Sequence, residues 1–241
     1  MGNSQSDTIA AIATPPGVGG LGVIRLSGPE AALIADKVFR ASAGRTLDGA
    51  ASHTVHYGHI IDPETGAVVD EVMAAVMRAP RSFTAEDVVE ISAHGSAVVL
   101  QKILLLLLRA GARMAQAGEF TKRAFVNGRL DLARAEAVLD VIHADSDASL
   151  SNAIDQLEGG LSREIEAIRQ PLLYAAAQFA AAVDYPDEDI ADLSEESLRA
   201  TLTQAKNACQ ALLDGAGSGR IAKDGLRCTL AGRPNVGKSS L

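Results

Sequence analysis

The residues best suited to chemistry lie in a glycine-rich stretch near the end of the printed sequence. Gly232–Leu241 reads GRPNVGKSSL, which contains the spacing G-x-x-x-x-G-K-S. In such a loop the glycines let backbone N–H groups point at a β-phosphate, and Lys238 brings a positive charge to the β- and γ-phosphates. The hydroxyl of Ser239 is suited to binding Mg²⁺. Because the strand-like run Gly225–Ala231 precedes the loop, the stretch predicts the start of a nucleotide-binding domain.

A second glycine-rich stretch, Gly17–Gly22, reads GVGGLG and looks superficially like a dinucleotide-binding fingerprint. It follows Pro15-Pro16 rather than a strand, and it leads into the strand-like run Val23–Leu26 rather than a helix. A dinucleotide site needs the opposite context, a strand before the glycines and a helix after them. Two interpretations stay open: a tight loop between strands, and a loop whose backbone closes on a ligand.

Composition narrows the class of protein. The chain has 241 residues and a net charge of −8, which argues against a general grip on nucleic-acid phosphates while leaving room for a local basic patch. Its two cysteines, Cys209 and Cys228, are far apart and in no metal spacing, as expected for reduced thiols in a cytoplasmic protein. The most apolar run, Ile103–Leu108, is too short to cross a bilayer, so we expect no membrane association.

The first half of the chain has the pattern of a mixed α/β domain. The apolar segment Ser96–Arg109 predicts a helix that is buried on more than one side, and Glu30–Arg40 predicts an earlier helix with Pro29 in its first turn. Five segments are rich in strand-forming residues: they are Thr8–Ala13, Gly22–Ser27, Tyr57–Ile61, Glu71–Arg78 and Val88–Ser92.

The second half predicts helices only. Apolar residues recur at steps of three and four within three stripes, which puts each stripe on one helix face; the stripes span 135–157, 161–183 and 198–212. Gly159-Gly160 separates the first predicted helix from the second. The acidic loop Asp184–Asp192 separates the second from the third, which Ser194 can cap. Three helices with open stripes form a bundle that lacks a member.

Two further residue types mark irregularities in these helices. Pro171 lies inside the second stripe, where a proline should kink the helix or end a turn. The glycine-rich run Gly215–Gly219 predicts a hinge that leads into the terminal strand. We therefore expect the helical region to end before residue 220.

Many short motifs match one protein family in order along the chain. The matching residues begin with Asp7-Thr8-Ile9, Ala13–Gly17, Gly19-Gly20, Ser82-Phe83-Thr84, Glu86-Asp87-Val88 and His94-Gly95. They continue with Gly118–Thr121, Arg123–Phe125, Asn127–Leu132, Ala135-Glu136-Ala137, Asp184-Tyr185-Pro186, Glu188-Asp189-Ile190 and Gly232–Leu241. On these residues the sequence resembles the MnmE (TrmE) family of tRNA-modification GTPases.

The resemblance implies an α+β architecture in three parts. An N-terminal domain, expected over 1–122, would be related to the folate-binding domain of the glycine-cleavage aminomethyltransferase and would also dimerise. A helical domain, expected over 123–219, would be incomplete, because in the family the GTPase (G) domain is inserted into it and the last helices return afterwards. Residues 220–241 would hold only the first strand and phosphate loop of the G domain.

The family also implies an activity, cofactors and partners. Such proteins act with the flavoprotein MnmG, as a heterotetramer, to add an aminomethyl or carboxymethylaminomethyl group at carbon 5 of the wobble uridine of certain tRNAs. A bound tetrahydrofolate derivative, 5-formyltetrahydrofolate or methylenetetrahydrofolate, would supply the one-carbon group, and GTP would be hydrolysed with K⁺ and Mg²⁺. We expect this chain by itself to bind folate and to dimerise but not to hydrolyse GTP.

Three positions match the family's folate contacts: Arg25, Glu90 and Arg129. A carboxylate such as Glu90 can accept hydrogen bonds from a pterin N–H and amino group, and the two arginines can meet carbonyl or carboxylate oxygens. Without the resemblance, Arg25 can also be read as a solvent-facing strand residue, Glu90 as a structural ion-pair member and Arg129 as a surface charge at a helix start. His94 is read as structural rather than catalytic.

The phosphate-loop residues take roles by the same resemblance. Asn235 matches a position that helps to hold K⁺, which would act as a fixed positive charge facing the γ-phosphate, as an arginine finger does. Contacts to phosphate and Mg²⁺ match the run Val236-Gly237-Lys238-Ser239-Ser240, with Ser239 as the Mg²⁺ ligand. We expect this loop to be unordered without the rest of its domain, because its N–H groups need a sheet and a helix to hold them.

The chain departs from the family at a few positions. It has Ala93-His94-Gly95-Ser96 where Gly-His-Gly-Gly is usual, and Arg129 where Lys is common, which keeps the charge but changes the hydrogen-bond geometry. Three other functions remain as alternatives: a folate-dependent aminomethyltransferase-like enzyme, a non-catalytic assembly module, and another phosphate-loop NTPase such as an ATPase.

Overall fold

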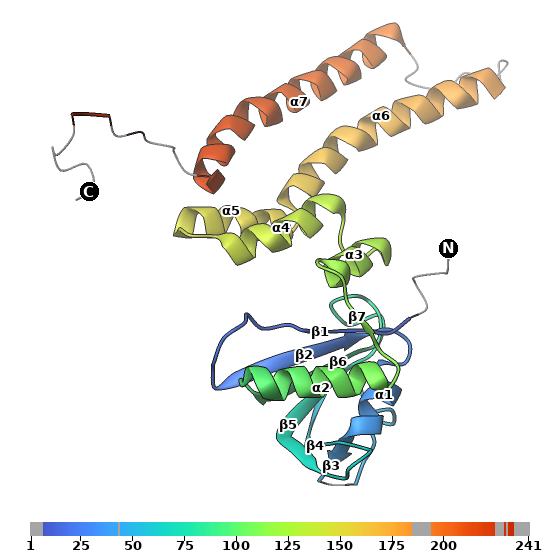
Figure 1. The fold of residues 1–241 in the computed structure, drawn as a ribbon. Helices are drawn as coiled ribbons and strands as arrows, with labels where there is room; N and C mark the ends of the chain where they lie inside the picture. Colours follow the sequence, from blue (N-terminus) through green and yellow to red (C-terminus); the bar gives the residue numbers. More distant parts are fainter. Residues whose placement is uncertain (1–6, 43, 185–193, 225–228, 230, 234–241) are drawn as a thin grey trace. The chain divides into compact units, whose positions relative to one another are not determined.

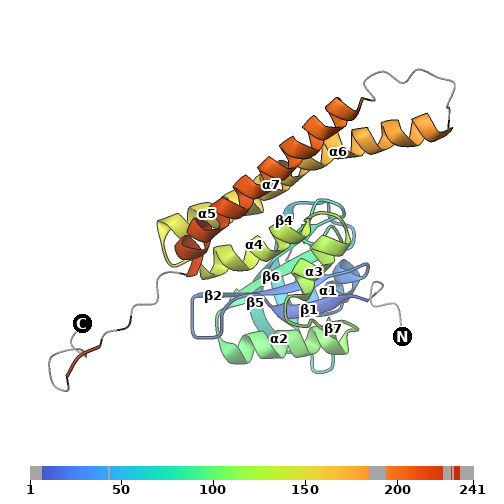
Figure 2. The ribbon, with the colours of Figure 1, turned by 90° about the horizontal axis from the view of Figure 1, so that it is seen from above.

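The computed structural model describes residues 7–42, 44–184, 194–224, 229 and 231–233. The chain divides into two compact units, Met1–Asp131 and Leu132–Leu241, which Figures 1 and 2 show in two views. The first unit is a mixed α/β domain and the second is helical, so both fold classes predicted from the sequence patterns are present. The predicted strand Gly225–Ala231 and the phosphate loop fall almost wholly outside the described residues.

The first unit is built on one sheet, whose strands in the described chain run in the order β3-β4-β5-β6-β2-β1-β7. Neighbouring strands are antiparallel, apart from the parallel pair β1 and β7. The strands are β1 (Ile9–Ile12), β2 (Leu21–Ser27), β3 (Phe39–Ala41), β4 (Thr54–Ile61), β5 (Val68–Met77), β6 (Val88–His94) and β7 (Arg113–Met114). All five predicted strands are present. The patterns missed β3 and β7, because two or three residues are too few to show an alternation.

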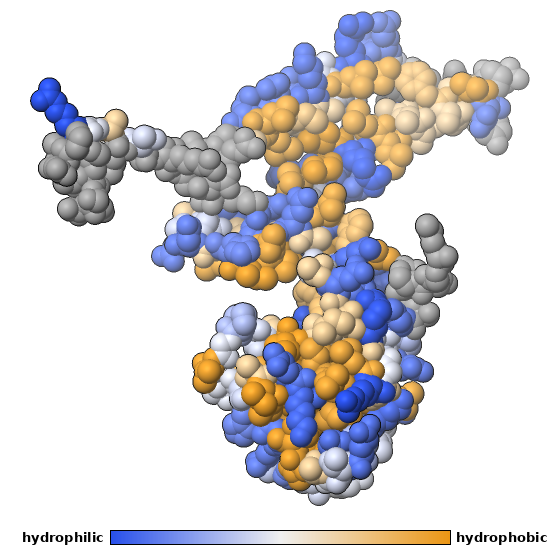
Figure 3. All heavy atoms as spheres, in the orientation of Figure 1, coloured by the Kyte–Doolittle hydropathy of each residue, from blue (hydrophilic) through white to orange (hydrophobic). Residues whose placement is uncertain are grey.

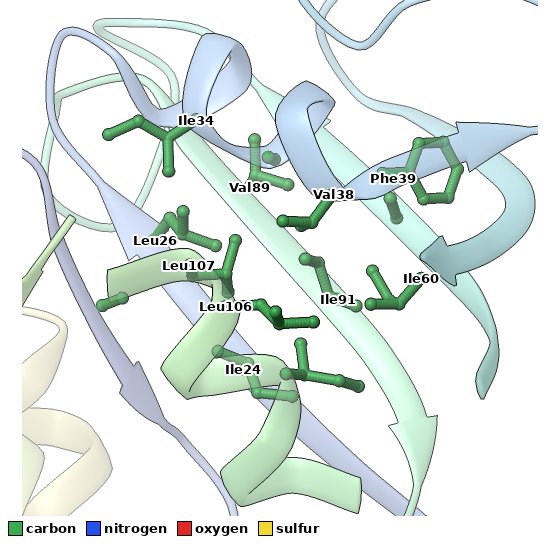
Figure 4. Close-up of a cluster of buried hydrophobic side chains, with 14 of the residues drawn as sticks. Ile24, Leu26, Ile34, Val38, Phe39, Ile60, Val89, Ile91, Leu106 and Leu107 are labelled. Atoms are coloured by element: carbon green, nitrogen blue, oxygen red, sulfur yellow. The ribbon is translucent and has the colours of Figure 1, made fainter. Parts of the chain in front are cut away.

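Two helices, α1 (Ala31–Val38) and α2 (Ala97–Arg109), cover one face of this sheet. The helix α2 buries five leucine and isoleucine side chains on one face. The predicted burial on more than one side was wrong, because Val98 and Leu105 on its other side are 74% and 48% exposed. Figure 4 shows these helices packed on the alternate residues of β2 and β6 that point inward, among them Ile24, Leu26 and Ile91. Burial of this aliphatic set supplies the main driving force for folding the unit.

The opposite face of the sheet carries the polar residues of the same strands. Successive side chains of a strand point to opposite faces, so the neighbours of Ile24 and Ile91, Arg25 and Glu90, lie on the face away from α1 and α2. A third helix, α3 (Glu119–Val126), follows β7 in the same unit. The sheet therefore separates an apolar core from a face that is free to hold functional side chains.

The second unit consists, over its described residues, of four helices: α4 (Leu132–His143), α5 (Asp147–Leu157), α6 (Gly160–Asp184) and α7 (Glu195–Asp224). Within the unit α4 packs against α5, and α6 against α7. The first apolar stripe predicted a single helix up to Gly159, and this was wrong. Ser146 starts a new helix, because its Oγ accepts a hydrogen bond from the Ser149 N–H (3.2 Å) and Ser149 Oγ accepts one from the Ser146 N–H (3.2 Å).

The remaining helix predictions had mixed outcomes. Ser194 caps α7 as predicted, accepting a hydrogen bond from the Ser197 N–H at 3.1 Å. Pro171 does not end α6, which continues past it to Asp184. The predicted hinge at Gly215–Gly219 was wrong, because α7 runs through it to Asp224. Each glycine costs a helix about 1 kcal/mol, which a long helix can absorb. No helix of the described chain is long and apolar enough to cross a membrane.

Candidate functional site

Arg25 and Glu90 form an ion pair on the polar face of the sheet. They lie directly opposite each other on the antiparallel strands β2 and β6. The Arg25 Nε donates a hydrogen bond to Glu90 Oε1 at 2.7 Å, and the Arg25 Nη2 lies 2.7 Å from the same oxygen. Their side chains are 25% and 28% exposed. Each charge is therefore compensated while the pair stays within reach of solvent and of a ligand.

Two phenyl rings frame this ion pair. The Arg25 Cζ lies 5.1 Å from the centroid of the Phe83 ring and 5.6 Å from that of Phe120. The Arg129 Cζ lies 5.2 Å from the Phe83 centroid, and the Arg129 Nη1 donates to the Phe83 carbonyl oxygen at 2.7 Å. Guanidinium groups at such distances are attracted to the ring faces. Arg25, Glu90 and Arg129, predicted as one site, thus gather around Phe83.

The site's hydrogen-bonding capacity suits a flat heterocycle with N–H donors. Only Oε1 of Glu90 is engaged by Arg25, and within the described chain no hydrogen bond reaches its Oε2. A carboxylate oxygen in this position can accept from a ring N–H or an exocyclic amino group. The phenyl rings offer apolar surfaces against which such a ring can pack. The predicted residues therefore fit a pterin.

Hydrogen bonds from β2 and from the end of α3 hold the segment that carries Phe83. Ser27 Oγ lies 2.6 Å from Thr84 Oγ1 and donates to Glu86 Oε2 at 2.7 Å. The Asn127 Nδ2 donates to the Thr84 carbonyl oxygen at 2.7 Å. Since Ser27 and Thr84 are fully buried, these bonds fix the loop that presents the ring.

Arg123 anchors the helix that carries the second ring. It lies on α3, its side chain is buried, and its Nη2 donates to Asp7 Oδ1 at 2.6 Å. Its Nη1 contacts both oxygens of Glu86, at 3.2 and 3.1 Å, and it lies 3.5 Å from Glu119 through Nη2. A fork of donors that meets several carboxylates orients the whole helix. Arg123 therefore positions Phe120 without belonging to the ion pair itself.

A second arginine strengthens this cluster. Arg113, on β7, donates to Asp7 Oδ2 at 2.6 Å and to Glu119 Oε1 at 2.6 Å. Its hydrogen bond lowers the pKa of Asp7, with a smaller contribution from Arg123 in the same direction. Hydrogen bonding to Arg113 likewise lowers the pKa of Glu119, so both carboxyl groups stay ionised at neutral pH.

Sequence patterns did not assign roles to Phe83, Phe120 or Arg123, although all three stand in the matched motifs. One signal could have drawn attention to the rings: aromatic residues make up only 3% of the chain, and Phe83 and Phe120 stand in matched motifs. The nucleotide-site residues Asn235, Val236, Gly237, Lys238, Ser239 and Ser240 lie outside the described residues. Among the residues that the structure covers, no group of three or more His, Cys, Asp or Glu side chains is arranged to hold a metal.

Comparisons with known proteins match both units. The family described as "GTP-binding protein TrmE N-terminus" matches residues 8–129, and the family described as "MnmE helical domain" matches residues 132–236. The "tRNA modification GTPase MnmE" of Geobacillus kaustophilus is 49% identical over 239 residues, which is 99% of this chain and 52% of the relative. Those of Enterococcus faecalis and Listeria welshimeri are 51% and 52% identical over 238 residues, 98% of this chain and 51% of each relative.

The two family matches agree with the division into compact units, since they meet between residues 129 and 132. The chain spans about half the length of the curated relatives it matches. The first family alone covers more than half of the sequence, and it contains Arg25, Glu90 and Arg129. On these matches, the chain belongs to the MnmE (TrmE) family.

Proposed function

We propose that Arg25, Glu90 and Arg129 bind the pterin ring of a reduced folate, such as 5-formyltetrahydrofolate or methylenetetrahydrofolate. One observation carries this proposal: a guanidinium–carboxylate pair whose carboxylate keeps one oxygen without a partner in the described chain, framed by Phe83 and Phe120. The first unit would then be a folate-binding domain of the aminomethyltransferase-related type.

Each side chain would recognise a different part of the ligand. Glu90 Oε2 would accept from the amino group and the adjacent N–H of the pterin, while its Oε1 stays with Arg25. Arg129 is exposed and keeps donors beyond the one given to the Phe83 carbonyl, so it would meet a carbonyl or carboxylate oxygen. The ring would pack against Phe83, whose position the Thr84 and Glu86 hydrogen bonds maintain.

For the whole protein we propose the activity that its relatives' names state, tRNA modification coupled to GTP hydrolysis. In that protein the second unit would be part of a helical bundle, and residues 220–241 would begin the G domain. GTP, Mg²⁺ and K⁺ would be bound through the loop that contains Asn235, Lys238 and Ser239. MnmG and tRNA would be partners, in the cytoplasm, and this chain by itself would not hydrolyse GTP.

Dimerisation through the first unit is part of the same proposal. On the polar face of the sheet, β4 and β5 carry an apolar group, because Val55, Tyr57 and Met73 are 64%, 51% and 48% exposed. The register places Tyr57 opposite Met73 and Val55 opposite Ala75, so these side chains are neighbours on one face. A second copy of the chain would bury this surface.

Isothermal titration calorimetry with 5-formyltetrahydrofolate tests the ligand. The wild-type chain should bind, and Glu90→Ala should weaken binding by at least about tenfold, since it removes a charged hydrogen-bond acceptor worth about 1.5–3 kcal/mol. Glu64→Ala is the matched control, because Glu64 is exposed and lies in the turn between β4 and β5, outside the candidate site. Absence of heat with a well-folded wild-type chain, or unchanged binding by Glu90→Ala, contradicts the folate proposal.

Light scattering coupled to size-exclusion chromatography tests the dimer. Tyr57→Glu should shift the chain toward the monomer, whereas Val98→Asp, on the exposed side of α2, should leave the mass unchanged. A dimer that binds no folate would favour the assembly-module interpretation. Turnover of an aminomethyl donor by this chain without a partner would favour a folate-dependent transferase instead.

A further inference from the structure

His94 and Asp70 form a pair at the end of β6 to which the proposed folate contacts assign no role. His94 Nδ1 lies 2.7 Å from Asp70 Oδ1, and the His94 backbone N–H donates to Asp70 Oδ2 at 2.8 Å. Both carboxylate oxygens therefore hold the same residue, one through its ring and one through its main chain. This arrangement fixes the orientation of the imidazole.

The Asp70 side chain is largely buried, whereas the His94 ring is open to solvent and to a ligand. The Asp70 side chain is 11% exposed, whereas that of His94 is 67% exposed. Burial tends to raise the pKa of Asp70, but hydrogen bonds from the backbone and ring of His94 outweigh it, and the pKa is lowered. Asp70 therefore stays ionised and keeps a proton on His94 Nδ1, which leaves Nε2 as the nitrogen that gains and loses one.

Among the described residues, the charged groups that act on the imidazole lie on β5. Asp70 raises the pKa of His94 by its hydrogen bond and its charge, and Glu71 adds a smaller effect in the same direction. From β2 the cross-strand neighbour is the apolar Leu21. The pKa of His94 is thus raised above its ordinary value.

His94 shares a face of β6 with Glu90. Glu90 and His94 are four residues apart on β6, so their side chains point to the same side, about 13 Å apart along the strand. A pterin held at its amino edge by Glu90 and lying along β6 would direct its other end, which carries the one-carbon group, toward His94.

The glycine-rich loop 17–22 borders the same place. The Gly19 N–H donates to the Gly95 carbonyl oxygen at 3.1 Å, and the Gly95 N–H donates to the Gly20 carbonyl oxygen at 3.4 Å. A Cβ on Gly95 would lie 2.5 Å from the Gly19 oxygen, so only glycine permits this close docking next to His94. The loop then leads into Leu21, which is 67% exposed and lies opposite His94 on β2.

We infer that His94, held by Asp70, is a ligand-facing proton donor and acceptor for the one-carbon end of the folate bound by Glu90. The inference rests on the proposed function. The proton leaves Nε2 for a nitrogen or oxygen of the ligand and returns to Nε2, while the Nδ1 proton stays in its hydrogen bond to Asp70.

NMR of the imidazole groups tests this in the wild-type chain. The five histidines are distinguished with His94→Asn, and each pKa is measured with and without saturating 5-formyltetrahydrofolate. If Nε2–H donates to the ligand, folate should raise the pKa of His94 by about half a unit or more, and leave the other four unchanged. Calorimetry should show correspondingly tighter binding below this pKa than above it, by about threefold or more.

His94→Asn also separates a ligand contact from a merely structural role. The asparagine amide can still donate to Asp70 from the place of Nδ1, but it has no group at the place of Nε2. A ligand-facing His94 predicts weaker folate binding, by about fivefold or more, and loss of the pH dependence. Circular dichroism melting verifies that the variant is folded.

The outcomes separate this inference from the proposed function. If the folded wild-type chain binds no folate, both fail. If it binds folate but the His94 pKa is unmoved and His94→Asn binds as tightly, the folate site stands and the proton-transfer role is overturned. The His94–Asp70 pair would then only join β5 to the end of β6.

Discussion

The two units of the chain bury their apolar residues to very different extents. In the first unit, Ile24, Leu26, Ile91 and Leu107 are completely buried, together with many smaller side chains. In the described part of the second unit, the buried side chains are only Ala137, Ser149 and Ala153, and α6 has none. The apolar residues of the first unit are therefore packed into a core, whereas most of those in the described part of the second unit are not.

Several exposed residues of the second unit belong to the stripes that predicted its helices. Ile165, Phe179 and Val183 on α6 are 49%, 42% and 78% exposed, and Leu202 on α7 is 52% exposed. Figure 3 shows hydrophobic residues at the surface of these helices. A stripe of this kind specifies a helix, but most helical stability comes from packing the stripe against a partner.

The comparison teaches which function each unit can support alone. A site with side chains held to within a fraction of an ångström needs a rigid scaffold, and the buried sheet–helix core provides one beneath Arg25 and Glu90. In the proposed whole protein, returning helices would cover the stripes of α6 and α7. The first unit would then be a self-sufficient binding domain, and the second an element that is completed by the rest of the protein.

The largest expected contrast between the units comes from removing the same side chain in each. Leu107→Ala, in the completely buried part of α2, should destabilise the first unit by about 2–5 kcal/mol, because it leaves a cavity. Leu173→Ala, at a half-exposed position of α6, should cost about 1 kcal/mol or less. Hydrogen exchange followed by mass spectrometry measures both units in one chain. Equal losses of protection would show that α6 is packed in solution.

Removing a buried charge should produce the next largest contrast. Arg123→Ala leaves Asp7 and Glu86 without their shared partner and should destabilise the first unit by about 3 kcal/mol. Arg163→Ala, 66% exposed on α6, should change stability by less than about 1 kcal/mol. Urea unfolding measures both. Arg123→Lys should recover part of the loss, because it keeps the charge but not the fork, and an Arg123→Ala variant as stable as wild type would refute the anchoring role.

Acid should weaken the first unit through the same cluster. The pKa values of Asp7 and Glu119 lie below their ordinary values of 3.8 and 4.5 in the folded state. The stability that they contribute is therefore complete above about pH 4.5 and is lost as the pH falls through the lowered values. Protection of β1 and α3 amides should fall over this window. In Asp7→Asn the decrease should be smaller, and an equally steep decrease would assign the acid sensitivity to other groups.

Sequence patterns predicted the long elements of the sheet and only part of the site. Strands such as β2 and β6 show the alternation that places Arg25 and Glu90 on one face, so their proximity follows from pairing the two strands. Phe83 comes from the loop between β5 and β6, which has no periodicity, so nothing in the spacing placed its ring over Arg25. Asp70 reaches His94 only through the register of β5 against β6.

In the helical unit the error was the opposite one, because a regular apolar spacing predicted a helix across a position where one helix ends and another begins. Ile142, Ser146 and Leu150 continue a four-residue step, which predicted one helix through them. In the structure the Ser146 side chain caps the following helix instead of joining the stripe. A small polar residue can satisfy free N–H groups at a helix start, and this local hydrogen bonding outweighs the periodicity.

Ser146 therefore provides the smallest and sharpest test of the comparison. Ser146→Ala removes the acceptor for the Ser149 N–H and should destabilise α5 by about 1 kcal/mol. Ser151→Ala, at an exposed position inside the same helix, should stabilise it slightly, by about 0.5 kcal/mol, through higher helix propensity. Because the second unit has little core to compensate, a loss of this size should appear as faster exchange of the α5 amides. The first unit should be unaffected, and equal responses to the two serine variants would mean that α4 and α5 behave as one helix in solution.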